Sequence, residues 1–94
     1  MFKTVHSPKQ QRLIQLLRQV RIEADLSQSE VARRLKVPQS LVSKYESGDR
    51  RLDLVELEKV CEAAGITLAE FIRRYQAGAT DEYPEKSESS FTVA

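Results

Sequence analysis

The chain has 94 residues, enough for one small domain, and its 40% hydrophobic and 31% charged residues suit a soluble globular fold. No apolar run approaches the roughly 18 residues of a membrane span, and the first residues lack the apolar stretch of a signal peptide. A lone cysteine excludes an internal disulfide. We therefore expect a cytoplasmic protein. The net charge of +1 is unevenly distributed along the chain. Residues 1–51 contain eleven Lys and Arg and five Asp and Glu, whereas residues 52–94 contain four and nine. This asymmetry is expected either of a basic binding surface on the first part or of ordinary solvated helix faces.

The first predicted helix has Ser7 as its N-cap, a position that serine favours, and Pro8 as its first helical residue. Its apolar stripe at helical spacing consists of Leu13, Leu17, Val20 and Ala24, with Ile14 beside them. A capping box from Ser27 to Glu30 predicts a short second helix. Its buried residues are expected to be Val31, Ala32 and Leu35.

After a break at residues 36–38, a third helix is predicted from about Gln39 to Ser47, and Gly48 ends it. Two helices this short, joined by a tight turn, must cross steeply, and Ala32 can let their backbones approach. On a helical wheel Leu41, Val42 and Tyr45 form a buried arc. The opposite arc is small, polar and free of carboxylates, and it consists of Ser40, Ser43, Lys44 and Ser47, with Gln39 at the helix start beside it.

Two further capping boxes, Asp53 to Glu56 and Thr67 to Glu70, predict a fourth and a fifth helix, closed by Gly65 and Gly78. The inward residues of the fourth should be Leu54, Leu57, Val60, Cys61 and Ala64, and those of the fifth Leu68, Phe71, Ile72 and Tyr75. The fold class is therefore all-α, with a domain over residues 1–78. Residues 79–94 are acidic and lack a helical stripe, which indicates a flexible, disordered tail or a segment that docks through Tyr83 or Phe91.

The pattern Arg21, Gln28, Ala32 followed by PQSLVSKYESG over residues 38–48 resembles the helix-turn-helix of lambdoid phage repressors and Cro, and of the Xre-type bacterial regulators. The resemblance spans residues 9–77 and implies a five-helix, lambda-repressor-like DNA-binding domain. By position it implies base contacts from Gln39, Ser40, Ser43 and Lys44. It implies phosphate contacts from Ser27, Gln28, Ser47, Arg50 and Arg51, and a structural ion pair of Arg21 with Glu46.

One position departs from that family. Many relatives have glycine in the turn where this chain has Lys36. A left-handed conformation at Lys36 would cost about 1–2 kcal/mol. Of the other reactive residues, Cys61 is expected to be a buried structural thiol, with a redox sensor as the alternative, and His6 receives no role.

Catalysis is not expected, because the chain has no glycine-rich phosphate loop, no metal-spaced ligand set and no nucleophile paired with a base. We expect no cofactor, no metal and no membrane partner. The function hypothesis is a transcriptional regulator, a repressor, that binds double-stranded DNA as a homodimer on a palindromic operator. Part of the fifth-helix face around Phe71, Ile72 and Tyr75 could serve the dimer. The alternative is an antitoxin or a restriction-modification controller protein that also binds a protein partner through its tail.

Overall fold

A computed structural model describes residues 7–82, and within them the chain forms helices and no strand. The predicted all-α, five-helix fold is confirmed. In chain order the helices are α1 (Pro8–Glu23), α2 (Gln28–Leu35), α3 (Gln39–Ser47), α4 (Leu54–Ala63) and α5 (Leu68–Glu82). The calls on residues 83–94, including docking through Tyr83 or Phe91, lie outside the described residues, as does His6. No described helix is long and apolar enough to cross a membrane.

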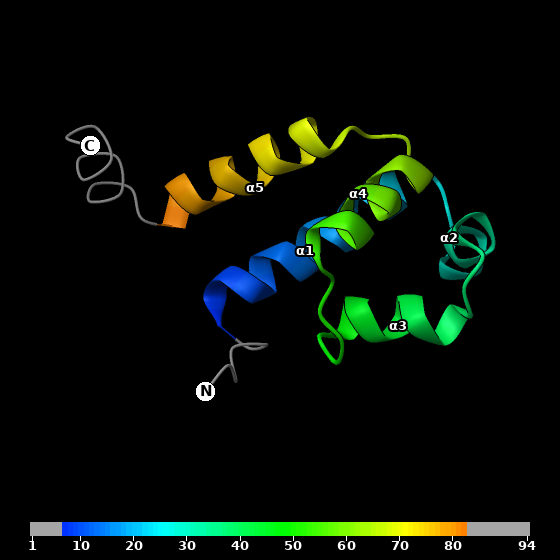
Figure 1. Cartoon of the computed structure of the whole chain (residues 1–94). Helices are drawn as coiled ribbons and strands as arrows, with labels where there is room; N and C mark the ends of the chain where they lie inside the picture. The colour runs from blue at the N-terminus through cyan, green and yellow to red at the C-terminus, as the bar shows by residue number, and fades with distance from the viewer. Residues whose placement is uncertain (1–6, 83–94) are drawn as a thin grey trace.

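The helices surround one core, with α1 and α5 packed along each other and α2, α3 and α4 completing the bundle. Figure 1 shows α3 along the lower edge of the molecule, beneath α1, with α2 at its end. Phe71, Val42 and Cys61 are fully buried, as are Val31 and Tyr45 to within a few per cent. This arrangement holds α3 by one side only and leaves its other side at the surface.

Each predicted cap forms, but only one box closes on both sides. Ser7, Ser27 and Thr67 each accept a hydrogen bond from the backbone N–H three residues on, at 3.0–3.1 Å. In the box of α4, Asp53 accepts from the Glu56 N–H at 2.7 Å while Glu56 accepts from the Asp53 N–H at 2.9 Å. The glutamates of the α2 and α5 boxes instead bind arginines of their own helices, a stronger partner for a carboxylate than a neutral N–H.

The turn between α2 and α3 contains a left-handed residue at Lys36, the position where many relatives have glycine. Lys36 has φ 61° and ψ 45° and ends α2, with the Val37 N–H donating to the Ala32 carbonyl at 3.0 Å. A second left-handed residue, Asp25 with φ 62°, lies before α2 and was not predicted. The helix-turn-helix therefore carries some backbone strain at Lys36, which the surrounding packing offsets.

Gly78 was expected to end α5, but the helix continues to Glu82. The physical reason is that Gly78 lacks the left-handed backbone conformation that ends a helix, which Gly48 and Gly65 have. A Cβ at Gly78 would lie 2.9 Å from the Cδ of the Arg12 side chain of α1. The guanidinium of Arg12 in turn lies over the Tyr75 ring, 4.7 Å from its centroid. Gly78 thus serves helix packing, and residues 79–82 belong to the helix, although the wider domain division at residue 78 stays a prediction.

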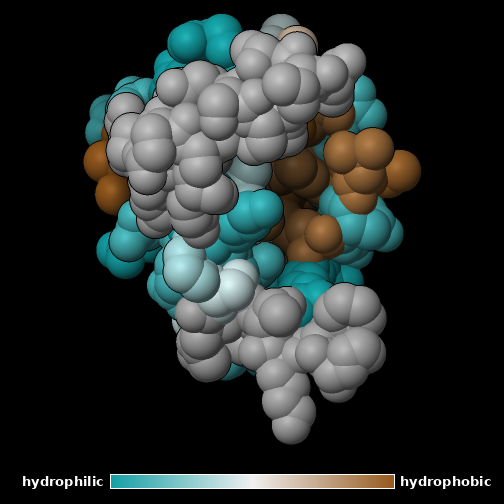
Figure 2. Space-filling view, turned by 90° about the vertical axis from the view of Figure 1, so that its left-hand side faces the viewer, coloured by the Kyte–Doolittle hydropathy of each residue, from teal (hydrophilic) through white to brown (hydrophobic). Residues whose placement is uncertain are grey.

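Four residues that were predicted to face inward are not fully buried and lie outside the core cluster: Ala24, Leu41, Leu54 and Ile72. Leu54 is 63% exposed because it is the first residue of α4, at the end that meets the α3–α4 loop, and Val55 beside it is 60% exposed. Leu41 is only half-buried and lies outside the core cluster, so Val42 and Tyr45 hold α3. Figure 2 shows hydrophobic side chains gathered in the right-hand part of the face that it draws, with a smaller group at the left-hand edge.

Cys61 is buried in the centre of this core, as the structural interpretation expected. Burial raises the pKa of its thiol to about 11, and the nearby Glu62 and Glu58 add to the rise. A thiol with that pKa stays protonated at neutral pH and is a poor nucleophile. These properties favour the structural role over the redox sensor.

Candidate nucleic-acid interface

The exposed side of α3 consists of the polar residues that the helical wheel placed there. Gln39, Ser40, Ser43, Lys44 and Ser47 are all exposed. Val42 and Tyr45 on the opposite side are 0% and 3% exposed, so they fix which way the helix faces. The single acid of the helix, Glu46, is 6% exposed and turned inward. The outer side of α3 is therefore polar and free of carboxylates.

Glu46 is held in the interior by Arg21 of α1. The Nε of Arg21 donates to Oε2 of Glu46 at 2.7 Å and its Nη2 donates to Oε1 at 3.0 Å, so the pair is bidentate. The Nη1 of the same arginine donates to the Leu26 carbonyl at 2.9 Å, in the loop before α2. This hydrogen bonding to Glu46 raises the pKa of Arg21. One arginine thus joins α1, the α1–α2 loop and α3.

A chain of side chains continues from Glu46 to the surface between α2 and α3. Gln28 donates from Nε2 to Oε1 of Glu46 at 3.0 Å. Gln39, the first residue of α3, donates from Nε2 to Oε1 of Gln28 over a longer 3.4 Å. Ser29 donates from its hydroxyl to Oε1 of Gln39 at 3.0 Å. Gln39 therefore lies over the amino-terminal end of α2 and contacts two of its residues.

The start of α2 has the geometry of an anion site at the surface. Ser27 is exposed and accepts from the Glu30 N–H at 3.0 Å, while the N–H groups at the first positions of α2 have no acceptor within the helix. Free N–H groups and the positive end of the helix dipole favour a phosphate at such a position. The two residues assigned to this role by resemblance thus lie next to each other, beside the first turn of α3.

The residues after α3 are partly engaged within the protein. Arg50 binds Glu56 through two hydrogen bonds, at 2.9 Å and 3.3 Å, and donates to the Arg51 carbonyl at 3.1 Å. This pairing lowers the pKa of Glu56, and the backbone bond at Asp53 lowers it further. Ser47 donates from its hydroxyl to the Lys44 carbonyl at 3.0 Å, and Arg51 is exposed. Arg50 therefore also ties the loop after α3 to the cap of α4.

A positioning contact that sequence reasoning missed joins α2 to α4. The Nη1 of Arg34 donates to the Ala63 carbonyl in the last turn of α4 at 2.8 Å. A cation at a helix carboxyl end also suits the helix dipole. No pattern in the sequence signals this contact, because its acceptor is a backbone carbonyl 29 residues away.

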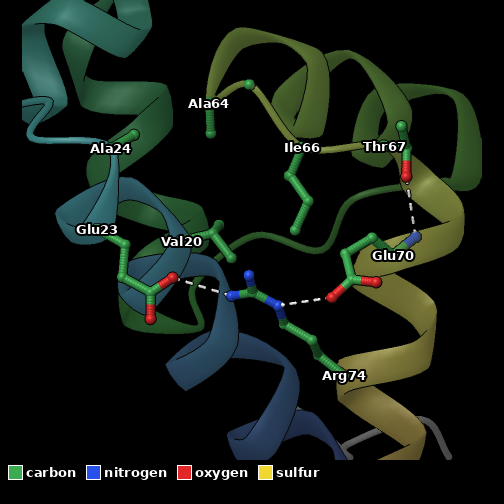
Figure 3. Close-up of a pocket in the computed structure, with 9 residues that line it drawn as sticks. Val20, Glu23, Ala24, Ala64, Ile66, Thr67, Glu70 and Arg74 are labelled. Carbon is green, nitrogen blue, oxygen red and sulfur yellow. Dashed lines mark hydrogen bonds and ion pairs between the residues drawn. The ribbon is translucent and has the colours of Figure 1, made fainter.

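Ion pairs at the end of α1 hold α5 against α1. A hollow of about 430 Å³ lies between the end of α1, the α4–α5 loop and α5. Figure 3 shows the residues that line it. Within it Arg74 donates to Glu23 of α1 at 2.9 Å and to Glu70 of its own helix at 3.2 Å. Bonds from Arg73 first and then Arg74 lower the pKa of Glu70 to about 2. These charges pair with one another, and among residues 7–82 no three His, Cys, Asp or Glu side chains group as metal ligands.

Comparison with known proteins adds independent information. A family model described as a helix-turn-helix matches residues 17–71, from α1 into α5. A solved structure, an XRE-family like protein from Pseudomonas syringae pv. tomato str. DC3000, is 39% identical in sequence with a TM-score of 0.73. That match covers 80% of this chain and 92% of the other. No match was found among the curated proteins.

Proposed function

Because the chain belongs to the Xre/Cro/C1 family of helix-turn-helix proteins, which are DNA-binding transcription regulators, we propose that it is a cytoplasmic repressor that binds a palindromic operator as a homodimer. The observation that carries this proposal is the outer side of α3, which is exposed, polar and free of carboxylates. A surface that meets phosphate-rich DNA must avoid negative charge. In the proposed complex α3 lies in the major groove.

Sequence preference comes from the first turns of α3. A glutamine side chain matches the adjacent acceptor and donor of adenine, and a lysine reaches the O6 and N7 acceptors of guanine. Gln39 and Lys44 take these roles, while Ser40 and Ser43 accept or donate as the base edge requires. All four side chains are exposed, and the fixed orientation of Tyr45 and Val42 supports their direction.

Phosphate contacts fix the position of α3 and supply most of the affinity. Ser27 and Gln28 bind one phosphate at the start of α2, where the first N–H groups have no acceptor within the helix and the helix dipole favours an anion. A second phosphate contacts Ser47, Arg50 and Arg51. Two N–H groups of Arg50 already bind Glu56, so a phosphate has to compete with that carboxylate for them.

The homodimer follows from the geometry of DNA. Two α3 helices can enter successive major grooves on one face of the duplex if they lie about 34 Å apart, which needs a two-fold axis between the protomers. The exposed Leu54 and Val55 support a contact at the start of α4, because adjacent exposed apolar side chains favour protein contact. On the fifth-helix face, the other candidate for the dimer contact, Phe71 is fully buried within the monomer and Ile72 and Tyr75 are half-buried.

The experiment is a binding titration with fluorescent duplexes, one carrying the sequence that the full chain selects from random DNA and one of scrambled sequence. Lys44→Ala should weaken the selected duplex by about 1–3 kcal/mol and leave the scrambled one nearly unchanged. Arg51→Ala should weaken both and lower the salt slope by about one. Lys59→Ala, an exposed lysine on α4, is the matched control and should bind like the wild type. Equal effects of Lys44→Ala and the control on the selected duplex would contradict the proposal.

A further inference from the structure

The side chains between α2 and α3 form a hydrogen-bond chain with a direction. It runs from Ser29 through Gln39 and Gln28 to Glu46, with donor-to-acceptor distances of 3.0, 3.4 and 3.0 Å. Burial increases along it, from the exposed Ser29 and Gln39 to the half-buried Gln28 and the buried Glu46. The chain thus joins a surface residue that faces DNA in the proposed complex to a charge in the core.

Glu46 fixes the direction of this chain. Its carboxylate, paired with Arg21, can only accept, so Gln28 must turn its Nε2 toward it. The Oε1 of Gln28 then faces Gln39, which must in turn present its own Nε2. A reversed Gln39 amide would place two carbonyl oxygens against each other. In the orientation that remains, the Gln39 amide directs its Oε1 toward Ser29.

Ser29 fixes the position of that amide. The bond from Gln39 to Gln28 is long at 3.4 Å and holds the side chain weakly, whereas the Ser29 hydroxyl approaches Oε1 of Gln39 to 3.0 Å. Ser29 is held by helix α2 and Gln39 begins helix α3, so the bond spans the turn between them. Without the hydroxyl, the long and flexible Gln39 side chain would keep only its weaker contact.

We propose that Ser29 is a specificity-determining positioning residue, which holds the Gln39 amide in the one orientation and place that suit adenine. Adenine offers one acceptor and one donor in a set order, whereas guanine offers two acceptors. Each polar atom of the held amide retains one further site, a second hydrogen on Nε2 and a second lone pair on Oε1. An amide ordered in advance loses less conformational freedom on binding. The inference rests on the proposed function, and it adds Ser29 as a residue that acts through Gln39.

The test uses the full chain and the duplex that it selects from random DNA, with every base pair at the Gln39 position compared in binding titrations. Ser29→Ala should reduce the preference for the selected base pair by about two- to tenfold, the range expected for ordering one side chain. Ser29→Thr retains a hydroxyl and should restore most of the preference. In a Gln39→Ala background, Ser29→Ala should have no further effect on base preference.

Three outcomes would overturn the inference. Ser29→Ala could leave the preference unchanged, or increase affinity because Ser29 competes with the base for Gln39, or act as strongly without Gln39 as with it. The proposed function fails separately, if the wild-type chain selects no sequence or if Gln39→Ala and Lys44→Ala both leave base preference intact. A Ser29→Ala chain that unfolds at the same denaturant midpoint as wild type shows that a change in preference is not a loss of folding.

Discussion

Replacing Arg21 by methionine should lower the free energy of unfolding by about 3–5 kcal/mol, the usual cost of leaving one charge of a buried pair without its partner. Glu46 has a side chain only 3% exposed and accepts three side-chain hydrogen bonds, two of them from Arg21. The variant leaves only Gln28 to stabilise its carboxylate. Against a total stability of roughly 5–15 kcal/mol for a domain, the loss is large. Urea unfolding followed by circular dichroism measures it as a lower midpoint with an unchanged slope.

Two variants control this experiment. Arg73→Met removes an arginine from an ion pair that is largely exposed, with 67% of the Arg73 side chain and 37% of Glu70 accessible, and should cost less than about 1 kcal/mol. Arg21→Met combined with Glu46→Gln should recover a substantial part of the loss, since no charge stays buried. A loss for Arg21→Met no larger than that for Arg73→Met would refute the view that this pair holds α1 to α3.

Three further predictions concern the scaffold. Lys36→Gly should raise the unfolding free energy by roughly 0.5–1 kcal/mol in urea titrations, because glycine relieves the left-handed strain but loses more chain entropy. Gly78→Ala should raise the free energy of unfolding, measured by a thermal melt, by less than the roughly 1 kcal/mol that helix propensity alone provides, because the new Cβ displaces the Arg12 side chain. In an Arg12→Ala background the same substitution should raise it by more, since that contact is gone. Glu70 has a folded-state pKa of about 2 against an ordinary 4.5, so its stabilisation is present above pH 4.5 and is lost toward pH 2. Glu70→Gln should flatten the stability curve over that range, and an unchanged curve would contradict the pKa shift.

Local signals predicted the helices well. Ser7, Ser27, Asp53 and Thr67 each cap a helix through the residue three positions on, so their spacing in sequence suffices to identify them. The wheel over residues 39–47 likewise needed only the helical repeat to separate its exposed side from Val42 and Tyr45. Interactions within one turn of helix are visible in sequence because the backbone fixes their geometry.

Tertiary contacts were predicted less completely. The Arg34 bond to the Ala63 carbonyl joins residues 29 apart, and the link from Gln28 to Glu46 joins residues 18 apart. Neither has a spacing that a helix would dictate. Gly78 illustrates the same limit, since its closeness to Arg12 depends on how α1 and α5 pack. The ion pair of Arg21 with Glu46, at a separation of 25 residues, was accessible only through family resemblance.

The central claim is that two copies of α3 read a two-fold symmetric DNA site. The most direct measurement is selection of bound duplexes from random-sequence DNA by the full chain, followed by sequencing of the winners. We expect two inverted half-sites with centres about 10–10.5 base pairs apart, and loss of the enriched bases for Lys44→Ala but not for Lys59→Ala. Selected DNA with no common sequence, or with one half-site and no symmetric partner, would contradict it.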